Sequence, residues 1–388
     1  MSGTITHKGM VPVARPFVGK EEEHAVLEVL RSGWLSQGKR VEEFERRFAQ
    51  YVGADHAIAV SSCTTALHLG MIAAGISQGD EVLCPSLSFI ATANSIVYQG
   101  ARPVFVDIDP RTYNLDPNRI EDAITPRTKA ILVVHQIGMP AALTEILEIA
   151  QRHNLIVIED AACAIGSEYR SNLINGRNSL LACFSFHPRK ILTTGEGGMI
   201  TTSNQDVARR LRRLRQHAMS ISDMARHGSR EVMIETYDEL GYNYRMTDLQ
   251  AAVGLVQLDR MSEFLERRRS LAARYTEKLA GIPWIVAPFQ PTYARSNFQS
   301  YMVRLTGDAA SRRDALMQSL LERGISTRRG IMASHREAPY RDASWDSQLP
   351  ATSAAADECI VLPLFHQMAQ EEQDFVVESI REVGHGLA

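Results

Sequence analysis

The sequence predicts an α/β fold, with a mostly parallel sheet sandwiched by helices and a smaller C-terminal α+β domain after it. Two observations predict this class. From residue 57 onward, short β-rich segments alternate with helical ones, the order typical of parallel sheets that carry helices on both faces. A long helical pattern from Thr247 then precedes a segment in which strands and helices follow a different order.

The elements are expected in the following order. Two helices come first, at residues 20–33 and 39–53, because apolar residues recur there at helical spacing and a glycine ends each pattern. The candidate strands are 57–60, 81–84, 103–107, 130–134, 155–159, 182–186 and 198–202. Helical spacing between them is found in TTALHLGMIAAG, SFIATANSIVYQG, LDPNRIEDAI and LTEILEIAQRH.

The last third of the chain is expected to form the smaller domain. One helical pattern runs from Thr247 to just before the GIP of residues 281–283, and a helix of that length commonly connects two domains. We therefore predict a large domain over 1–255 and a small domain over 256–388. Its elements are SYMVRLT, DALMQSLLERGI, ISTRRG and the terminal EEQDFVVESIREV.

Composition narrows the classes of function. The 388 residues are 45% apolar and 22% charged, with a net charge of −3, so no basic field favours nucleic acid or an anionic membrane. The five cysteines (Cys63, Cys84, Cys163, Cys183 and Cys359) form no CxxC, which indicates neither a disulfide scaffold nor a metal site. The sequence shows no signal peptide and no long apolar run, and we expect a soluble, cytoplasmic protein. GxGxxG and GxxxxGK[ST] are also missing, which disfavours dinucleotide and P-loop sites.

The stretch ACFSFHPRKILTTGEGGMITT, residues 182–202, is the most informative. Lys190 follows a predicted strand there, and the carboxyl ends of strands in such sheets face the ligand. A lysine nucleophile needs a desolvated or cationic setting that releases its proton. Most lysines are solvated surface residues, and the small and glycine-rich surroundings of Lys190 count against that interpretation.

Asp160 ends the apolar run LIVIED. A buried acid needs a partner, and an arginine or a helix N-terminus would serve a purely structural role equally well. Together with Lys190, Asp160 fits another partner, the protonated ring nitrogen of pyridoxal phosphate, whose aldehyde the lysine would hold.

A phosphate site should accompany such a pair. SSCTTALHLG follows the first strand as a hydroxyl-rich helix start, whose free N–H groups suit a phosphate, although ordinary capping gives the same pattern. Phe89 follows the second strand and could stack on the ring or simply belong to the core.

These residues lie within longer motifs that resemble the DegT-type sugar-nucleotide aminotransferases, a branch of the fold-type-I pyridoxal phosphate enzymes. The resemblance runs from GWLSQGKRVEEFE to the LPLF near residue 364. It rests on SSCTTALHLG, GDEVLCPSLSFIATAN, GARPVFVDIDP, IEDAACAIGS, FSFHPRKILTTGEGG and GYNYRMTDLQAAVGLVQL, in that order.

The resemblance implies a role for each site residue. Lys190 matches the lysine that bonds to the cofactor aldehyde and then moves the proton, and Asp160 matches the acid on the pyridinium nitrogen. Phe89 matches the aromatic residue over the ring. The donors to the phosphate would come from Cys63, Thr64 and Ser185.

One further residue follows from the resemblance, and two cysteines depart from its pattern. Asn243, in GYNYR, matches a residue that reaches the phosphate of the neighbouring subunit's cofactor, which implies a homodimer with shared active sites. Cys163 stands where glutamine or histidine usually contacts the cofactor, and Cys63 where many members carry glycine or alanine. His135 and His187 could be catalytic or structural.

The expected reaction moves an amino group from glutamate to a nucleotide-linked keto-deoxysugar, with ping-pong kinetics. A cyclitol aminotransferase on the same scaffold is an alternative that nothing in the sequence excludes. Relatives that are sugar dehydratases replace the lysine with histidine, so Lys190 favours transamination. A non-catalytic, cofactor-binding regulator is disfavoured because both Lys190 and Asp160 are present and no DNA-binding module or basic tail is visible.

Overall fold

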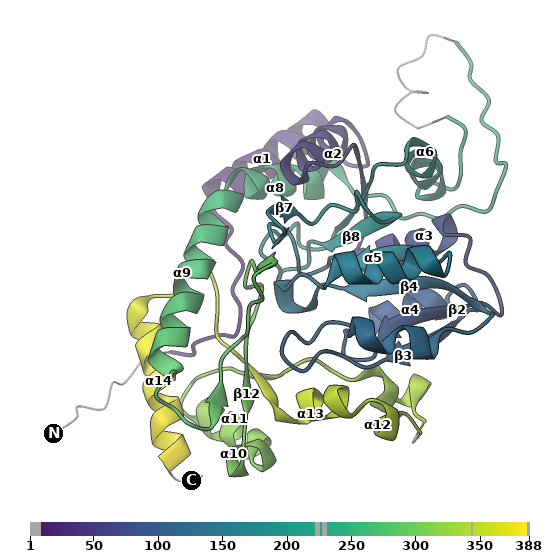
Figure 1. Ribbon diagram of the computed structural model, residues 1–388. Coiled ribbons are helices and arrows are strands. Elements are labelled where there is room, and N and C mark those ends of the chain that lie inside the picture. Colours follow the sequence, from purple (N-terminus) through teal and green to yellow (C-terminus); the bar gives the residue numbers. More distant parts are fainter. Residues whose placement is uncertain (1–8, 222–225, 227–230, 343, 386–388) are drawn as a thin grey trace.

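The computed structural model describes residues 9–221, 226, 231–342 and 344–385. Figure 1 shows a large helix-and-sheet layer that is joined along the long helix α9 to a smaller C-terminal layer. The large layer is built on one sheet of seven strands. In spatial order these are β1 (His56–Val60), β9 (Gly198–Thr202), β8 (Leu181–Ser185), β5 (Ile156–Asp160), β4 (Thr128–Val134), β2 (Glu81–Pro85) and β3 (Arg102–Val106).

The sheet is mostly parallel, as predicted, and all seven candidate strands are present. The pairs β2–β3, β2–β4, β4–β5 and β5–β8 are parallel, whereas β9 is antiparallel to both β1 and β8. Parallel strands end at the same edge, so the residues that follow β4, β5 and β8 are brought together there.

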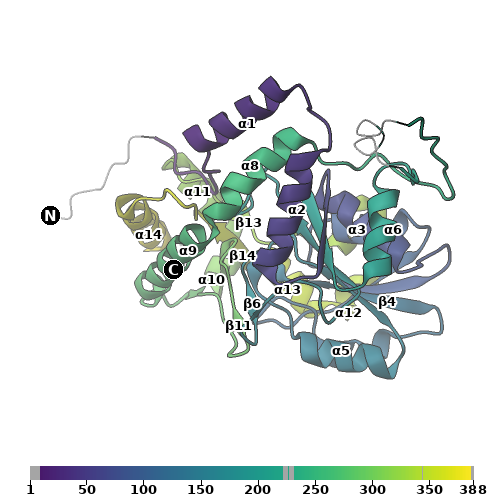
Figure 2. The ribbon, with the colours of Figure 1, turned by 90° about the horizontal axis from the view of Figure 1, so that it is seen from above.

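The sheet separates two apolar cores because side chains alternate between its faces. On β4, Ile131 and Val133 face one core, and Ala130 and Leu132 face the other. One face is covered by α2 (Lys39–Val52), α5 (Leu143–Arg152) and α8 (Asp248–Asp259), and the other by α3 (Cys63–Ala73), α4 (Ala91–Val97) and α6 (Gln205–Leu214). Figure 2 shows α1 (Lys20–Ser32) outside this arrangement, along α8.

The C-terminal part contains an antiparallel sheet of four short strands. Their order is β10 (Ile285–Val286), β12 (Tyr301–Leu305), β14 (Cys359–Leu362) and β13 (Arg328–Arg329). The helices α11 (Arg313–Glu322) and α14 (Gln370–His385) cover it. The remaining helices of this part are α10 (Asp308–Ser311), α12 (Ser344–Gln348) and α13 (Pro350–Glu358). Three further two-residue strands, β11 (Ala294–Arg295), β6 (Glu168–Tyr169) and β7 (Asn172–Leu173), form a small separate sheet.

Two predicted helices differ from the structure. LDPNRIEDAI forms two single 3₁₀ turns, Pro117–Arg119 and Glu121–Ala123, with Asp116 as the N-cap of the first. Two of its apolar residues, Leu115 and Ile120, are buried, which gives too little apolar surface to hold a longer helix. The helix predicted from Thr247 is divided at Arg260 into α8 and α9 (Met261–Leu279).

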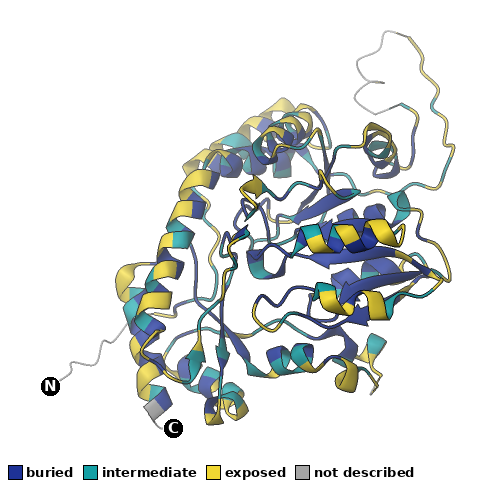
Figure 3. Cartoon of the chain, in the orientation of Figure 1, coloured by how far each residue is buried: buried dark blue, intermediate teal, exposed yellow. Residues whose placement is uncertain are grey.

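The helix α9 contacts both cores. Phe264 and Leu265, near its start, belong to the core of the large sheet, whereas Leu271 and Tyr275 pack into the core of the C-terminal part. Figure 3 shows the corresponding stripes of buried and exposed residues along this helix. The division into 1–255 and 256–388 stays a prediction.

Candidate active site

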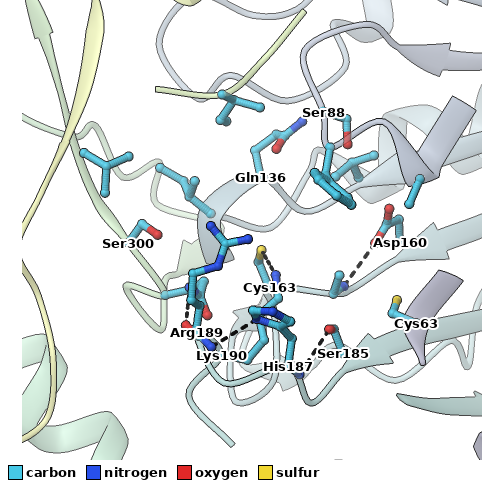
Figure 4. A pocket seen from close by; sticks show the side chains of 18 of the residues that line it. Cys63, Ser88, Gln136, Asp160, Cys163, Ser185, His187, Arg189, Lys190 and Ser300 are labelled. Carbon is cyan, nitrogen blue, oxygen red and sulfur yellow. Dashed lines mark hydrogen bonds between the residues drawn. The ribbon is translucent and has the colours of Figure 1, made fainter. Parts of the chain in front are cut away.

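One pocket lies at the edge where β4, β5 and β8 end, beside the start of α3. Its volume is about 640 Å³, and residues 328–332 of the C-terminal part line it as well. Figure 4 shows labelled side chains around this pocket, among them Cys63 of α3, Asp160 at the end of β5 and Ser185 at the end of β8. It gathers seven of the site residues expected from the sequence: Cys63, Thr64, Phe89, Asp160, Cys163, Ser185 and Lys190.

The N-terminus of α3 forms one wall of the pocket. Ser62 caps the helix, and its hydroxyl accepts a hydrogen bond from the backbone N–H of Thr65 at 3.2 Å. The N–H groups of Cys63 and Thr64 come before the first intrahelical bond, so they remain suited to an anion. Gly198 passes directly beneath this start, since a Cβ there would lie 2.5 Å from the carbonyl carbon of Ser62. This wall fits a phosphate.

Lys190 lies on the turn after β8, where its backbone N–H donates to the carbonyl of His187 at 2.8 Å. Its Nζ donates to Cys163 Sγ at 2.9 Å. Burial alone would lower the pKa of Lys190, but the nearby charge of Cys163 and the hydrogen bond to its sulfur, with Cys63 and Asp160 adding to them, raise that pKa above its ordinary value. The desolvated setting expected from the sequence is present, but these neighbours oppose the release of the proton that it was expected to cause.

Asp160 is the last residue of β5 and is buried. One carboxylate oxygen accepts from Thr92 Oγ1 at 2.8 Å, and the other accepts from the N–H of Ala162 at 3.1 Å. Burial raises the pKa of Asp160 even though these hydrogen bonds and the charge of Lys190 oppose the shift. Among the described residues no basic side chain forms an ion pair with this carboxylate, so a cationic ring nitrogen is a fitting partner.

Phe89 is 63% exposed although it is a large aromatic residue, and it opens onto the pocket rather than packing into the core. An aromatic face in this position can cover a flat ring. Lysine, acid, helix start and aromatic side chain therefore all fit pyridoxal phosphate.

Both histidines line the pocket, but their partners differ. His135 is fully buried, its Nδ1 accepts from the N–H of Ala141 at 3.1 Å, and its Nε2 lies 2.9 Å from a carboxylate oxygen of Glu159. Both ring nitrogens are thus engaged, which indicates a structural role. His187 is half-buried on the pocket wall, and burial, with the charge of Arg189, lowers its pKa.

Asn243 does not line the pocket. Its side chain is exposed, and its backbone forms an isolated bridge with Gln216. The predicted reach toward a second subunit stays a prediction.

Sequence reasoning missed several pocket residues. Thr92, which bonds to Asp160, lies on α4 and is 68 positions away in the sequence, so no local pattern could reveal the contact. Arg328 and Arg329 come from β13 of the C-terminal part, and Gln136 follows β4. In the part of the chain that the structure describes, no group of three His, Cys, Asp or Glu side chains is placed to hold a metal.

Fold and site together define a pyridoxal-phosphate-dependent enzyme of the fold-type-I architecture. The match over residues 16–381 is to the DegT/DnrJ/EryC1/StrS aminotransferase family, and the chain belongs to that family. None of the helices in the described ranges has the length and apolar character needed to cross a membrane.

Four relatives illustrate the match. The chain is 42% identical over 375 residues to the GDP-perosamine synthase of Caulobacter vibrioides, covering 96% of this chain and 98% of the relative. It is 39% identical over 381 residues to the spore coat polysaccharide biosynthesis protein SpsC of Bacillus subtilis, covering 97% of each. The aminotransferase TlmJ from Streptoalloteichus hindustanus has a TM-score of 0.89 at 34% identity, covering 97% of this chain and all of that one. DesV of S. venezuelae, in complex with a ketimine intermediate, has a TM-score of 0.87 at 34% identity, covering 97% and 99%.

Proposed function

We propose that this enzyme transfers the amino group of glutamate to the keto group of a nucleotide-linked deoxysugar, with pyridoxal phosphate as its cofactor. The observation that carries the proposal is the placement of Lys190 and the buried Asp160, which forms no ion pair with a basic side chain of the described residues, in one pocket beside the start of α3. The cofactor, when bound, draws electrons away from the carbon that carries the amino group.

Lys190 carries the proton in this proposal. Its Nζ accepts the proton from the α-carbon of the donor in the first half-reaction and returns a proton to the sugar carbon in the second. A lysine on a turn after a strand, held at 2.9 Å by a neighbouring side chain, is positioned well for this exchange.

The other pocket residues bind and orient. Asp160 would keep the proton on the ring nitrogen, which suits a buried carboxylate whose hydrogen bonds from Thr92 and Ala162 come from neutral donors. Phe89 would cover one face of the ring and exclude water from it. The N–H groups of Cys63 and Thr64, with Ser185, would hold the phosphate.

The substrate class follows from the relatives and from the pocket. The name GDP-perosamine synthase, borne by a relative 42% identical over nearly the whole chain, supports a nucleotide-linked sugar. The basic side chains of Arg189, Arg328 and Arg329 line the pocket, and they suit substrates that carry phosphate or carboxylate groups. Glutamate as donor belongs to the same proposal.

We also infer a homodimer in which Asn243 completes the partner's site. The exposed position of Asn243, away from its own pocket, supports this part of the proposal. Asparagine is common in exposed loops, so the pairing needs a direct test.

The experiment is a two-step assay on purified protein loaded with pyridoxal phosphate. Glutamate alone should change the absorbance of the bound cofactor, and a member of a panel of GDP-, UDP- and dTDP-linked ketosugars should then restore it as the aminosugar forms. Lys190→Ala is the control that keeps the rest of the pocket. Amination of a keto-cyclitol but of no nucleotide sugar would replace the proposed substrate class, and loss of water from the sugar without amination would indicate a dehydratase. A protein whose absorbance glutamate leaves unchanged would contradict the proposed donor.

A further inference from the structure

The contact between Cys163 and Lys190 is an unusual feature of this pocket. The Nζ of Lys190 lies 2.9 Å from Cys163 Sγ, and within the described residues this thiol is its one hydrogen-bond partner (Figure 4). Four of the five cysteines are buried, whereas Cys163 is half-exposed and lines the pocket. The sulfur therefore faces the reacting space.

The backbone around Cys163 is held by the side chain of Asn297, which lies 134 positions later in the chain. The amide Nδ2 of Asn297, which is fully buried, donates to the carbonyls of Cys163 and Ile165 at 2.8 Å each. Gly138 leaves the space for this amide, since a Cβ there would lie 1.8 Å from Asn297 Oδ1. The thiol is thus held in place on an anchored segment.

We propose that Cys163 is a positioning residue that holds the amine of Lys190 in both of its protonation states. A thiol can donate S–H to a neutral amine, and its sulfur can accept N–H from an ammonium. When Lys190 takes a proton, the hydrogen bond reverses direction without movement of either side chain, and it reverses again when the proton leaves. This role rests on the proposed function, but the contact can be tested without any turnover.

The test measures how fast Lys190 reacts with a small amine reagent in the cofactor-free protein. Trace acetic anhydride at pH 8 acetylates a lysine only when its amine is neutral, and peptide mapping by mass spectrometry gives the rate at Lys190 relative to the exposed Lys129. In either protonation state the contact with Cys163 Sγ slows acetylation, because S–H donation engages the lone pair of the neutral amine and N–H donation to sulfur stabilises the unreactive ammonium. Cys163→Ala removes both contacts and should make Lys190 react about threefold to tenfold faster, the range expected for loss of one such hydrogen bond.

Two variants separate this role from a general change of structure. Cys163→Ser keeps a donor and an acceptor and should give a rate between those of wild type and Cys163→Ala. Cys183→Ala is the matched control, because Cys183 is a buried thiol on β8 that does not bond to Lys190. It should leave the rate at Lys190 unchanged. Should Cys163→Ala fail to fold, Cys163→Val provides the same comparison.

An unchanged Lys190 rate in Cys163→Ala, or a Ser variant equal to the Ala variant, would overturn the proposal. The loaded enzyme adds a second readout. The kcat of Cys163→Ala should fall about threefold to tenfold with little change in the KM for the ketosugar, and Cys163→Ser should recover most of it. A labelling shift in a protein without transaminase activity would keep the contact and reject the proposed function. Activity without a labelling shift would do the reverse.

Discussion

Replacing Asp160 with asparagine tests the least expected feature of the pocket, a buried carboxylate without a basic ion-pair partner among the described residues. The substitution nearly preserves shape and removes the charge. Asparagine can still accept from Thr92 or Ala162, the two donors that Asp160 uses at 2.8 and 3.1 Å. The main loss is the charged interaction that would keep a proton on the ring nitrogen of the cofactor.

The size of that loss follows from the burial of Asp160. A charge-assisted hydrogen bond in a buried site contributes about 2–4 kcal/mol, and each 1.4 kcal/mol corresponds to about a tenfold change in rate. Turnover of Asp160→Asn should therefore fall by a few hundred-fold, within a range of about 30-fold to 900-fold.

Although turnover should fall, the cofactor-free Asp160→Asn protein should gain stability relative to wild type at neutral pH. Burial raises the pKa of Asp160, so the folded state binds this proton more tightly than the unfolded state does. The stability that this proton supplies is present below the unfolded pKa and is lost as the pH rises through the folded pKa. The Tm of Asp160→Asn relative to wild type should thus be higher at pH 7 than at pH 4.

The assay compares kcat and thermal unfolding with and without cofactor. Glu81→Gln is the control, since Glu81 is a buried carboxylate at the start of β2, away from the pocket, where it accepts from Arg127. It should lose stability and keep turnover within about twofold. Near-normal turnover of Asp160→Asn, or an equal loss in Glu81→Gln, would refute the role of this carboxylate.

Three further predictions test other parts of the site. Lys190→Ala should abolish transamination, measured by product formation, while fluorescence titration still detects some cofactor binding through the phosphate and ring contacts; measurable turnover would reject Lys190 as the proton carrier. Gly198→Ala would place a Cβ 2.5 Å from the backbone of Ser62 and should weaken cofactor binding at least about tenfold, whereas Gly281→Ala, with no atom within 4 Å of the new Cβ, should not. Mixing inactive Lys190→Ala with an inactive Asn243 variant should restore some activity, because one site of each mixed dimer would have both residues; subunit exchange without recovered turnover would mean that Asn243 does not serve a partner's site.

The sheet was predictable from the sequence because its strands carry short apolar runs separated by clear helical or turn segments. The strand at 130–134 is buried on both faces, and such a run is easy to recognise. The helix expected over 115–124 failed because periodicity alone does not reveal how little apolar surface is buried there. The break at Arg260 was also missed, since the apolar pattern continues across it.

The pocket positions of Asp160 and Lys190 were predictable because a motif coincides with the end of a strand at Asp160 and with the turn after a strand at Lys190. The contacts that tune the site were not. Asn297 holds the backbone of Cys163 from 134 positions away, and only the packing of α9 and the segment after it brings the two together. Propensity and spacing describe neighbours in sequence, so they contain no information on such a pair.

The most direct measurement is to locate the lysine that binds the cofactor. The protein is loaded with pyridoxal phosphate, reduced with borohydride to fix the cofactor covalently, digested and mapped by mass spectrometry. We predict one modified residue per chain, Lys190. In the Lys190→Ala variant, no other lysine should be modified to a comparable extent. A cofactor fixed to a different lysine, or a protein that binds none, would contradict the assignment of this pocket.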